Sequence, residues 1–474
     1  MHPLASSLPG WALFRARALG LAPSAAALAR ALAVDLPRAE LAVAPEATLW
    51  AALPAAVARF RALVAADAGR SAALATSERT AAPGDDAASL LDLAAALARR
   101  LLAPCRLCHL RCPVDRTAGP AGRCGLGPGL RVYRDYVHLG EEQELVPTHA
   151  VFLAGCNWRC AYCSDWAHVA RPEEDPETTT AALARSIDAR RAEGARSLTF
   201  VGGLPDVNLP GVLDALAAAR ASVPVVWNSN LSATPEAHDL LEVAVDAWVA
   251  DLKYGGEACS RAGSAAPDAL ARVHENLLRV AGQAPTPGYL VVRHLVLPGH
   301  TDCCARPALD WVAAHLPGAR VNLMGQFEPI PEVRGTAWDR RPAREEVARA
   351  REHARALGLD LDLDGPGPLD PPGSSRPGPW AAVPGAAPGA PAAAPAFESA
   401  IRIDADGRVV LEDLPPDLAD LAHALGALAE ADRDPADEGA APGDLARRRA
   451  AAAPWLAPDP PGPGGCFDPA AGDQ

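Results

Sequence analysis

Short apolar segments and longer amphipathic segments alternate regularly along residues 150–359. The short segments have strand character, whereas the longer ones place apolar residues at the spacing of one helix face. The alternation predicts six strands, at residues 151–154, 197–201, 224–227, 247–250, 289–297 and 320–324. It also predicts six helices, at residues 179–193, 211–221, 235–243, 268–281, 307–315 and 344–357. Strands and helices that alternate in this way are typical of a parallel sheet with helices outside it.

The number of units limits the kind of α/β fold. A complete eight-unit barrel takes about 250 residues, and the six units here span fewer. We therefore expect a partial (β/α)6 barrel or an open, doubly wound sheet. In both folds the chemistry lies at the carboxyl ends of the strands, on the loops that lead into the helices. The unusual residues of this chain follow the predicted strands, which is where such a site would lie.

The pattern changes on both sides of this region. The first hundred residues are rich in Ala, Leu and Arg at helical spacing, and the stretch after residue 362 is rich in Pro, Ala and Gly, a composition that buries little apolar surface. A short stretch near residue 400 has the pattern of a β-hairpin followed by a helix. The predicted organisation is a helical N-terminal region (1–100), a Cys-rich metal-binding segment with one strand at 130–138 (101–148), the partial barrel (149–362), a linker (363–399), a hairpin and helix module (400–430) and a disordered tail (431–474).

Charge and hydropathy exclude several classes of partner. The chain has 44 basic and 58 acidic residues and a formal charge of −14, with no dense Lys/Arg stripe to neutralise phosphates, so we expect no nucleic acid partner. The N-terminal 20 residues lack a cleavable apolar core, and no later run of about 18 uncharged apolar residues could span a bilayer. We expect a soluble, cytoplasmic protein without a membrane partner.

The cysteines point to metal. Seven of the eleven lie in two tight groups between Cys105 and Cys163, whereas a disulfide framework suits a small secreted chain. Cys156, Cys160 and Cys163 have CxxxCxxC spacing directly after a predicted strand. Three thiolates on a short loop can each bind one iron of a [4Fe-4S] cluster and leave the fourth iron open. A zinc site, the alternative, would need a fourth protein ligand, for which His168 is a weak candidate.

This loop, with its strand context, resembles the radical S-adenosylmethionine (SAM) superfamily. The resemblance implies that SAM binds the open iron and is reductively cleaved to a 5'-deoxyadenosyl radical, which abstracts hydrogen from a substrate. It also implies a reductant such as flavodoxin or ferredoxin. Tyr162 has the aromatic character that the superfamily uses near the adenine, although packing within the loop would explain it equally well.

Two further strand ends carry residues that could contact the cofactor. Gly202 and Gly203 would let a ligand approach the backbone closely, and they resemble the GGE-type motif that binds the ammonium group of SAM, with Leu204 in place of the acidic residue. A simple turn is the alternative. Asn228 and Asn230 could serve the ribose or a cation, or could form a turn.

Lys253 is the single lysine beside 43 arginines, which indicates a role that arginine does not fill. Asp251 and Lys253 resemble the D-x-K element of glycyl-radical activating enzymes, relatives of the pyruvate formate-lyase activating enzyme. A compact ammonium suits the carboxylate of the cofactor or a neighbouring acid. The alternative is a solvated loop lysine.

Longer motifs narrow the resemblance. The chain resembles a poorly characterised branch of iron-sulfur proteins related to pyruvate formate-lyase activating enzymes, over about residues 104–358. The motifs that carry this resemblance are residues 138–142, 292–300 and 321–327 and the first Cys group, at residues 105–124. The resemblance implies that Arg293 and His294 face the cofactor or substrate; a polar pair satisfied inside the barrel is the alternative. The implied substrate is a protein glycine or a small molecule. A non-catalytic iron-sulfur or zinc scaffold, or an electron-transfer protein, is the competing function.

The first Cys group supplies a complete ligand set for one further metal centre. Its four thiols, with glycines beside Cys124, suit either an auxiliary iron-sulfur cluster or structural zinc, and the spacing does not decide between them. These residues are Cys105, Cys108, Cys112 and Cys124. The remaining cysteines read as structural or incidental, with a redox or ligand role for Cys303 and Cys304 as the lesser alternative; the other two are Cys259 and Cys466.

Overall fold

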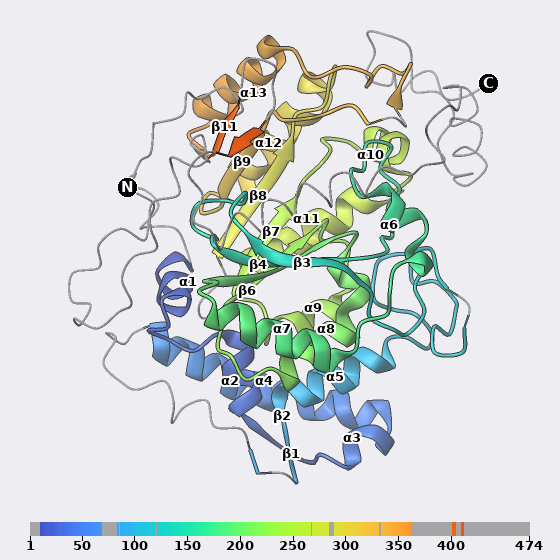
Figure 1. Cartoon of the computed structure of the whole chain (residues 1–474), viewed down its shortest axis with the longest axis vertical. Helices are drawn as coiled ribbons and strands as arrows, with labels where there is room; N and C mark the ends of the chain where they lie inside the picture. Colours follow the sequence, from blue (N-terminus) through green and yellow to red (C-terminus); the bar gives the residue numbers. More distant parts are fainter. Residues whose placement is uncertain are drawn as a thin grey trace. The chain divides into compact units, whose positions relative to one another are not determined.

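The computed structural model describes residues 10–68, 83–84, 86–119, 121–266, 268–283, 289–330 and 333–361, and the backbone of residues 401–403 and 409–411. An eight-stranded sheet forms its centre (Figure 1), with the strands in the spatial order β10-β9-β8-β7-β6-β5-β4-β3. The strands are β3 (Val132–His138), β4 (Thr148–Leu153), β5 (Ser197–Gly202), β6 (Val225–Ser229), β7 (Ala247–Asp251), β8 (Tyr289–Leu295), β9 (Arg320–Met324) and β10 (Asp360–Leu361).

The sheet confirms the predicted parallel α/β fold. Strands β4 to β9 are parallel and lie side by side in chain order, β10 adds in parallel to β9, and β3 pairs antiparallel with β4. The edge strands β3 and β10 leave the sheet open, as expected for a partial barrel. All six predicted parallel strands are present, since strands buried on both faces read as continuous apolar runs.

The predicted helices follow their strands. They are α7 (Thr180–Ala192), α8 (Leu209–Ala218), α9 (Pro235–Leu241), α11 (Ala269–Ala281), α12 (Arg306–His315) and α13 (Arg344–Ala356). Side-chain caps fix where two of them begin, because the Thr179 and Thr234 hydroxyls accept hydrogen bonds from the backbone N–H groups of Ala182 and Ala237. Trp227 and Trp248, which pair across β6 and β7, are among the largest fully buried side chains of the core.

Several short elements were not predicted. They are α6 (Trp166–Ala170), α10 (Glu257–Ser264), the 3-10 turns η2 (Pro172–Glu174) and η3 (Pro205–Asn208), and the π-helical turn η4 (Thr301–Ala305) that precedes α12. The sequence around α10 is rich in Gly, Ser and Ala, which reads as a loop. Both α10 and η4 follow the carboxyl ends of strands, β7 and β8 respectively, so they contribute to the face where the chemistry is expected.

The N-terminal region is mainly helical, as predicted, but it also contains a small sheet. Its helices are α1 (Trp11–Ala18), α2 (Ala25–Ala31), α3 (Glu40–Val43), α4 (Glu46–Ala68) and α5 (Leu90–Arg100). Strands β1 (Ala33–Pro37) and β2 (Ala87–Ser89) pair antiparallel, and the prediction missed them because they are short. A buried ion pair of 2.5 Å between Arg17 and Asp246, which precedes β7, ties α1 to the amino end of the central sheet.

One helix among the described residues, Glu46–Ala66 within α4, is long and apolar enough to cross a membrane by length and composition alone. Buried core helices pass the same test, and one apolar side of α4 packs into the hydrophobic core. The residues on that side are Leu49, Leu53, Ala56, Val57, Phe60 and Val64.

In the C-terminal extension, β11 (Ile401–Ile403) and β12 (Val409–Leu411) form the predicted hairpin, with Arg402 opposite Val410. The helix predicted after it, the linker and the tail lie outside the described residues. The domain boundaries at 362, 399 and 430 therefore stay predictions.

Candidate metal and cofactor site

The three cysteines Cys156, Cys160 and Cys163 lie on one loop that leaves the carboxyl end of β4. The loop is tightly turned, since the Cys163 N–H donates to the Cys160 carbonyl oxygen over 3.1 Å. It is also held from outside, because the N–H groups of Arg159 and Ala161 donate to the backbone of the last residues of α10. We call residues 155–163 the cluster loop.

Burial keeps the cluster-loop thiols neutral in the absence of a ligand. It raises the pKa of Cys156 to about 12, with a further contribution from Cys160, and it raises the pKa of Cys163 well above the usual value. Burial also raises the pKa of Cys160, against which Lys253 and a hydrogen bond from Ser264 act. A metal must therefore displace the protons of buried thiols when it binds.

The donor set fits a cluster better than a single ion. Among the described residues, one group of three or more metal-binding side chains has all its ligand atoms within 4.8 Å of one another. The cluster-loop cysteines are not in that group, so their three sulfurs do not all lie within that distance of one another. Thiolates that share one zinc ion at about 2.3 Å lie no more than about 4.6 Å apart. The three thiols are nevertheless close enough to affect one another's pKa, which suits ligands of separate irons. His168, the weak fourth ligand, instead pairs with Asp175 over 2.8 Å and stacks on Tyr133.

The first Cys group lies beside the cluster loop. Cys105, Cys108 and Cys124 are buried, Cys112 is half-buried, and the pKa of Cys108 is raised to about 12 by burial, with Cys124 and Cys105 adding to the shift. The four thiols thus lie near one another, and their role as ligands of one metal centre stays a prediction. Gly122 packs closely against this group, because a Cβ at this position would lie 3.2 Å from the Cys112 sulfur.

Asn157 joins the two Cys groups, and the sequence analysis missed it. Its side chain hydrogen-bonds the Cys108 thiol, lies 3.9 Å from the Cys156 sulfur, and donates to the Ser232 hydroxyl over 2.7 Å. The Arg159 guanidinium adds a second link by donating to the Arg123 carbonyl oxygen, next to Cys124. A short polar residue next to a cysteine gives no periodic signal, so only the fold reveals this link.

The Asp251 and Lys253 pair lies next to the cluster loop. The Lys253 Nζ donates to the Asp251 Oδ2 over 2.8 Å, and each side chain is about one-fifth exposed. Burial would lower the pKa of Lys253, but Asp251 and Cys160 outweigh it and raise that pKa above its usual value, so the ammonium keeps its charge. The lysine is therefore neither a solvated loop residue nor remote from the thiols.

His294 and Arg293 hold the strands behind this pair. The His294 Nδ1–H donates to the Leu252 carbonyl oxygen over 2.6 Å, and burial lowers the pKa of His294 to about 4. Arg293 is opposite Asp251 in the β7–β8 register and forms an ion pair with both Glu141 and Glu142. Both side chains therefore have hydrogen-bond or ion-pair partners inside the barrel.

Glu142 connects three of the motifs that carried the resemblance. It is fully buried, receives 2.8 Å hydrogen bonds from the Arg293 Nε and from the Asn322 side chain, and has a pKa of about 2. Burial opposes that low pKa, and the charge of Arg293 outweighs it. Motifs separated by about 150 residues in sequence thus meet in one network.

The glycine pair serves the close approach of two backbones. Gly202 has a φ of 101°, and a Cβ there would lie 2.6 Å from the Leu153 N. A Cβ on Gly203 would clash with the Gly155 carbonyl oxygen at the start of the cluster loop. The pair therefore packs directly against the cluster loop, where its backbone could also meet a ligand.

The remaining predicted residues lie around the same edge. Tyr162 is half-buried, donates to the Tyr254 hydroxyl over 3.0 Å and packs edge-on against Phe327 and Trp338. Asn230 donates to the Asn157 side chain over 3.2 Å, which favours a structural role for it, while Asn228 is buried at the end of β6.

Asp206, on η3, was not singled out from the sequence. Its carboxylate accepts hydrogen bonds from the Trp227 indole and the Ser229 hydroxyl, and burial raises its pKa to about 6. It holds the end of β6, just before the asparagine-containing loop.

Comparison with known proteins shows the family of this chain. A family profile described as "Radical SAM superfamily" matches residues 151–312. The uncharacterized protein MJ0674 of Methanocaldococcus jannaschii is 32% identical over 278 residues, which is 56% of this chain and 78% of that protein. The chain belongs to the radical SAM superfamily. Membership implies SAM and a [4Fe-4S] cluster as cofactors, and radical SAM chemistry as the kind of enzymatic activity.

Solved structures give a more distant likeness. The crystal structure of Streptococcus suis SuiB bound to S-adenosylmethionine is 12% identical with a TM-score of 0.33, over 44% of this chain and 47% of that one. SuiB bound to the precursor peptide SuiA gives 12% identity and a TM-score of 0.32, over 44% and 46% of the chains. The radical SAM chain thus spans about half the length of these solved structures.

Proposed function

We propose that Cys156, Cys160 and Cys163 hold the [4Fe-4S] cluster and that the chain is a SAM-cleaving hydrogen-abstracting enzyme. When bound, the cluster would supply the electron for reductive cleavage of SAM, which would provide the radical for hydrogen abstraction from the substrate. The observation that carries the proposal is the position of three mutually interacting thiols beside Lys253, at the carboxyl edge of the parallel strands.

Lys253 has the charge and the free donors to bind the cofactor. Its ammonium carries three N–H groups, and one of them goes to Asp251. The remaining donors suit the SAM carboxylate, while the Asp251 carboxylate suits a cationic group of the cofactor. Burial raises the pKa of the Cys156 and Cys160 thiols, and the charge of Lys253 acts against that rise. Lys253 therefore favours the charged thiolates that iron requires.

We propose that Arg293 and His294 are positioning residues. Arg293 is engaged by two glutamates and His294 by the Leu252 carbonyl oxygen, so both fix the backbone that presents Asp251 and Lys253. Tyr162, Gly202, Gly203, Asn228 and Asn230 form the surrounding surface. We propose that the backbone of the glycine pair and the Tyr162 ring border the bound cofactor.

We propose that the first Cys group holds a second iron-sulfur cluster rather than zinc. Its sulfurs are absent from the one described group that is compact enough for a single ion, and buried thiols beside the cluster loop are well placed to relay an electron. The Asn157 side chain spans the two groups. We infer that electrons arrive from a flavodoxin or ferredoxin and that the protein acts in the cytoplasm.

The substrate class follows from the resemblance alone. The D-x-K element is similar to that of glycyl-radical activating enzymes. The motifs around Glu142, Arg293 and Asn322 are similar to those of a poorly characterised branch of iron-sulfur proteins related to pyruvate formate-lyase activating enzymes. Both likenesses support hydrogen abstraction from a protein glycine. A small molecule is the other substrate class we propose for this oxidoreductase.

The test is anaerobic reconstitution of the full chain followed by reduction with dithionite in the presence of SAM. The expected result is release of 5'-deoxyadenosine, which Cys160→Ala abolishes and Ser164→Ala, on an exposed neighbour of Cys163, preserves. If Cys160→Ala cleaves SAM as well as the unmodified chain does, the assignment of the cluster loop is wrong. Tight zinc without any calorimetric binding of SAM would instead favour a non-catalytic scaffold.

A further inference from the structure

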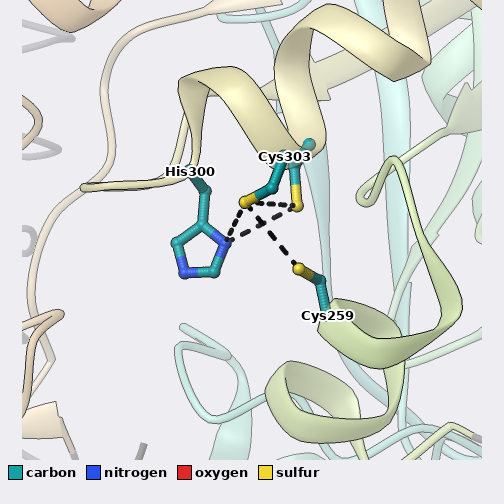
Figure 2. A group of neighbouring side chains, drawn as sticks. Cys259, His300 and Cys303 are labelled. Carbon is teal, nitrogen blue, oxygen red and sulfur yellow. Dashed lines mark hydrogen bonds between the residues drawn. The ribbon is translucent and has the colours of Figure 1, made fainter. Parts of the chain in front are cut away.

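A third group of metal-binding side chains lies outside both Cys groups. Cys259 comes from α10, Cys303 comes from η4, and His300 immediately precedes η4 (Figure 2). Cys304 also lies in η4. Their ligand atoms all lie within 4.8 Å of one another. Cys259 and Cys304 are buried, and the other two residues are half-buried. The segments involved follow β7 and β8, so the group sits at the same edge of the sheet as the cluster loop.

The distances in this group suit a single ion. The His300 Nδ1 is 3.6 Å from the Cys304 sulfur, and the Cys259 sulfur lies within 4.8 Å of both. Donors bound to one zinc ion at about 2.0 to 2.3 Å lie no more than about 4.6 Å apart. The donor types, thiolate and imidazole, are those that zinc prefers.

We propose that Cys259, His300 and Cys304 hold one Zn²⁺ ion. Cys303 is disulfide-bonded, so it supplies no thiolate and the site takes three protein ligands. The site goes beyond the radical SAM function proposed above, because it needs neither iron nor SAM.

The backbone around the group is built for close approach. A Cβ on Gly255 would lie 2.7 Å from the Cys303 carbonyl oxygen and 2.8 Å from that of Cys304. Only a glycine at this position lets the loop after β7 pass so close to η4. The His300 ring also contacts Trp338, 5.6 Å away between centroids, which fixes the face on which the imidazole meets the sulfurs.

The ion would brace the cluster loop through α10. Cys259 lies in the first turn of α10, and Ser264 at the other end of the same helix donates to the Cys160 sulfur over 2.9 Å. The carbonyl oxygens of Gly263 and Ser264 accept hydrogen bonds from the cluster loop. Zinc bound between α10 and η4 would therefore fix the helix that supports one cluster ligand.

The test is metal analysis of the full chain, purified and desalted under anaerobic conditions with added Zn²⁺, in variants of this group. Cys259→Ser and Cys304→Ser should each lose one zinc ion per chain and keep the iron of the unmodified protein. Ser260→Ala, which removes a buried hydroxyl from the same helix, should keep the zinc. His300→Ala should lose it and His300→Cys, which restores a donor, should recover it.

The outcome is independent of the cluster loop. Cys160→Ala should lose iron and keep this zinc, so failure of the proposed function and failure of the zinc site appear in different metals. Zinc content that stays unchanged in both Cys259→Ser and Cys304→Ser, with iron content and thermal midpoint also unchanged, would overturn the proposal. So would the loss of iron in place of zinc from those variants.

Discussion

The Ser264 hydroxyl donates a 2.9 Å hydrogen bond to the sulfur of Cys160, although the two residues are 104 positions apart. Ser264 also shares a 2.6 Å hydrogen bond with the Tyr254 hydroxyl, which in turn accepts from Tyr162. Helix α10 thus supports the cluster loop through both a ligand sulfur and an aromatic side chain. Hydrogen bonds to ligand sulfurs tune the potential of iron-sulfur clusters.

Ser264→Ala should lower the reduction potential of the proposed cluster. The hydrogen bond stabilises the more negative, reduced state, and about 1 kcal/mol of differential stabilisation corresponds to roughly 40 mV for a one-electron couple. A redox titration followed by electron paramagnetic resonance measures the shift. Ser260→Ala on the same helix serves as the control, and an unchanged potential in Ser264→Ala would show that this hydroxyl does not reach a cluster ligand.

Lys253→Arg should bind iron normally but cleave SAM slowly. Arginine keeps the charge, but its planar fork is larger than an ammonium and cannot occupy the space beside Asp251 and Cys160 in the same way. Loss of a preorganised electrostatic contact costs on the order of 100-fold in rate. The rate of 5'-deoxyadenosine formation in a single turnover, with iron content as the control, checks this. A Lys253→Arg rate equal to that of the unmodified chain would contradict a specific role for the ammonium.

The central fold was predictable from periodicity, because β6 and β7 are buried and read as apolar runs between amphipathic helices. The candidate residues lie at the strand ends, as the alternation of strands and helices predicted, since parallel strands bring their carboxyl ends together. The contacts between motifs were not predictable. Glu142 and Arg293 are 151 positions apart, and they meet although β5, β6 and β7 separate β4 from β8 in the sheet.

The group around His300 was also not predictable from the sequence. Cys259 and Cys303 are 44 positions apart with no motif spacing, and each reads as an incidental cysteine. Their approach depends on α10, which a Gly- and Ser-rich segment concealed, and on η4, which the helix prediction at 307–315 did not include. Short irregular elements position these side chains, and such elements leave little periodic trace.

Arg293→Met should destabilise the protein strongly. It leaves Glu142 buried without its charged partner, which typically costs about 3 to 5 kcal/mol. A lower thermal midpoint at pH 7 is the expected result. Arg293→Met combined with Glu142→Gln should recover part of the loss, because the neutral amide no longer needs the guanidinium. A double variant that is no more stable than Arg293→Met would argue against the pair.

The same ion pair predicts a pH dependence. The pKa of Glu142 is about 2 in the folded protein, below its ordinary value of 4.5, so the carboxylate contributes stability above pH 4.5. That contribution is lost as the pH falls from 4.5 toward 2, because the unfolded chain takes up the proton first. Thermal midpoints measured across this range should fall less steeply in Glu142→Gln than in the unmodified chain.

Gly203→Ala should disrupt the cluster loop, whereas Gly127→Ala should not. A Cβ on Gly203 meets the backbone oxygens of Gly155 and Leu153, which cannot yield without moving β4 or the cluster loop, whereas a Cβ on Gly127 meets nothing within 4 Å. Overpacking of this kind costs about 1 to 3 kcal/mol. Because the clash falls at the first residue of the cluster loop, iron incorporation should decrease together with the thermal midpoint in Gly203→Ala. Full iron content in that variant would mean that the metal does not require the close approach of β5 to the cluster loop. SAM binding would then test the ligand role proposed for the glycine backbone.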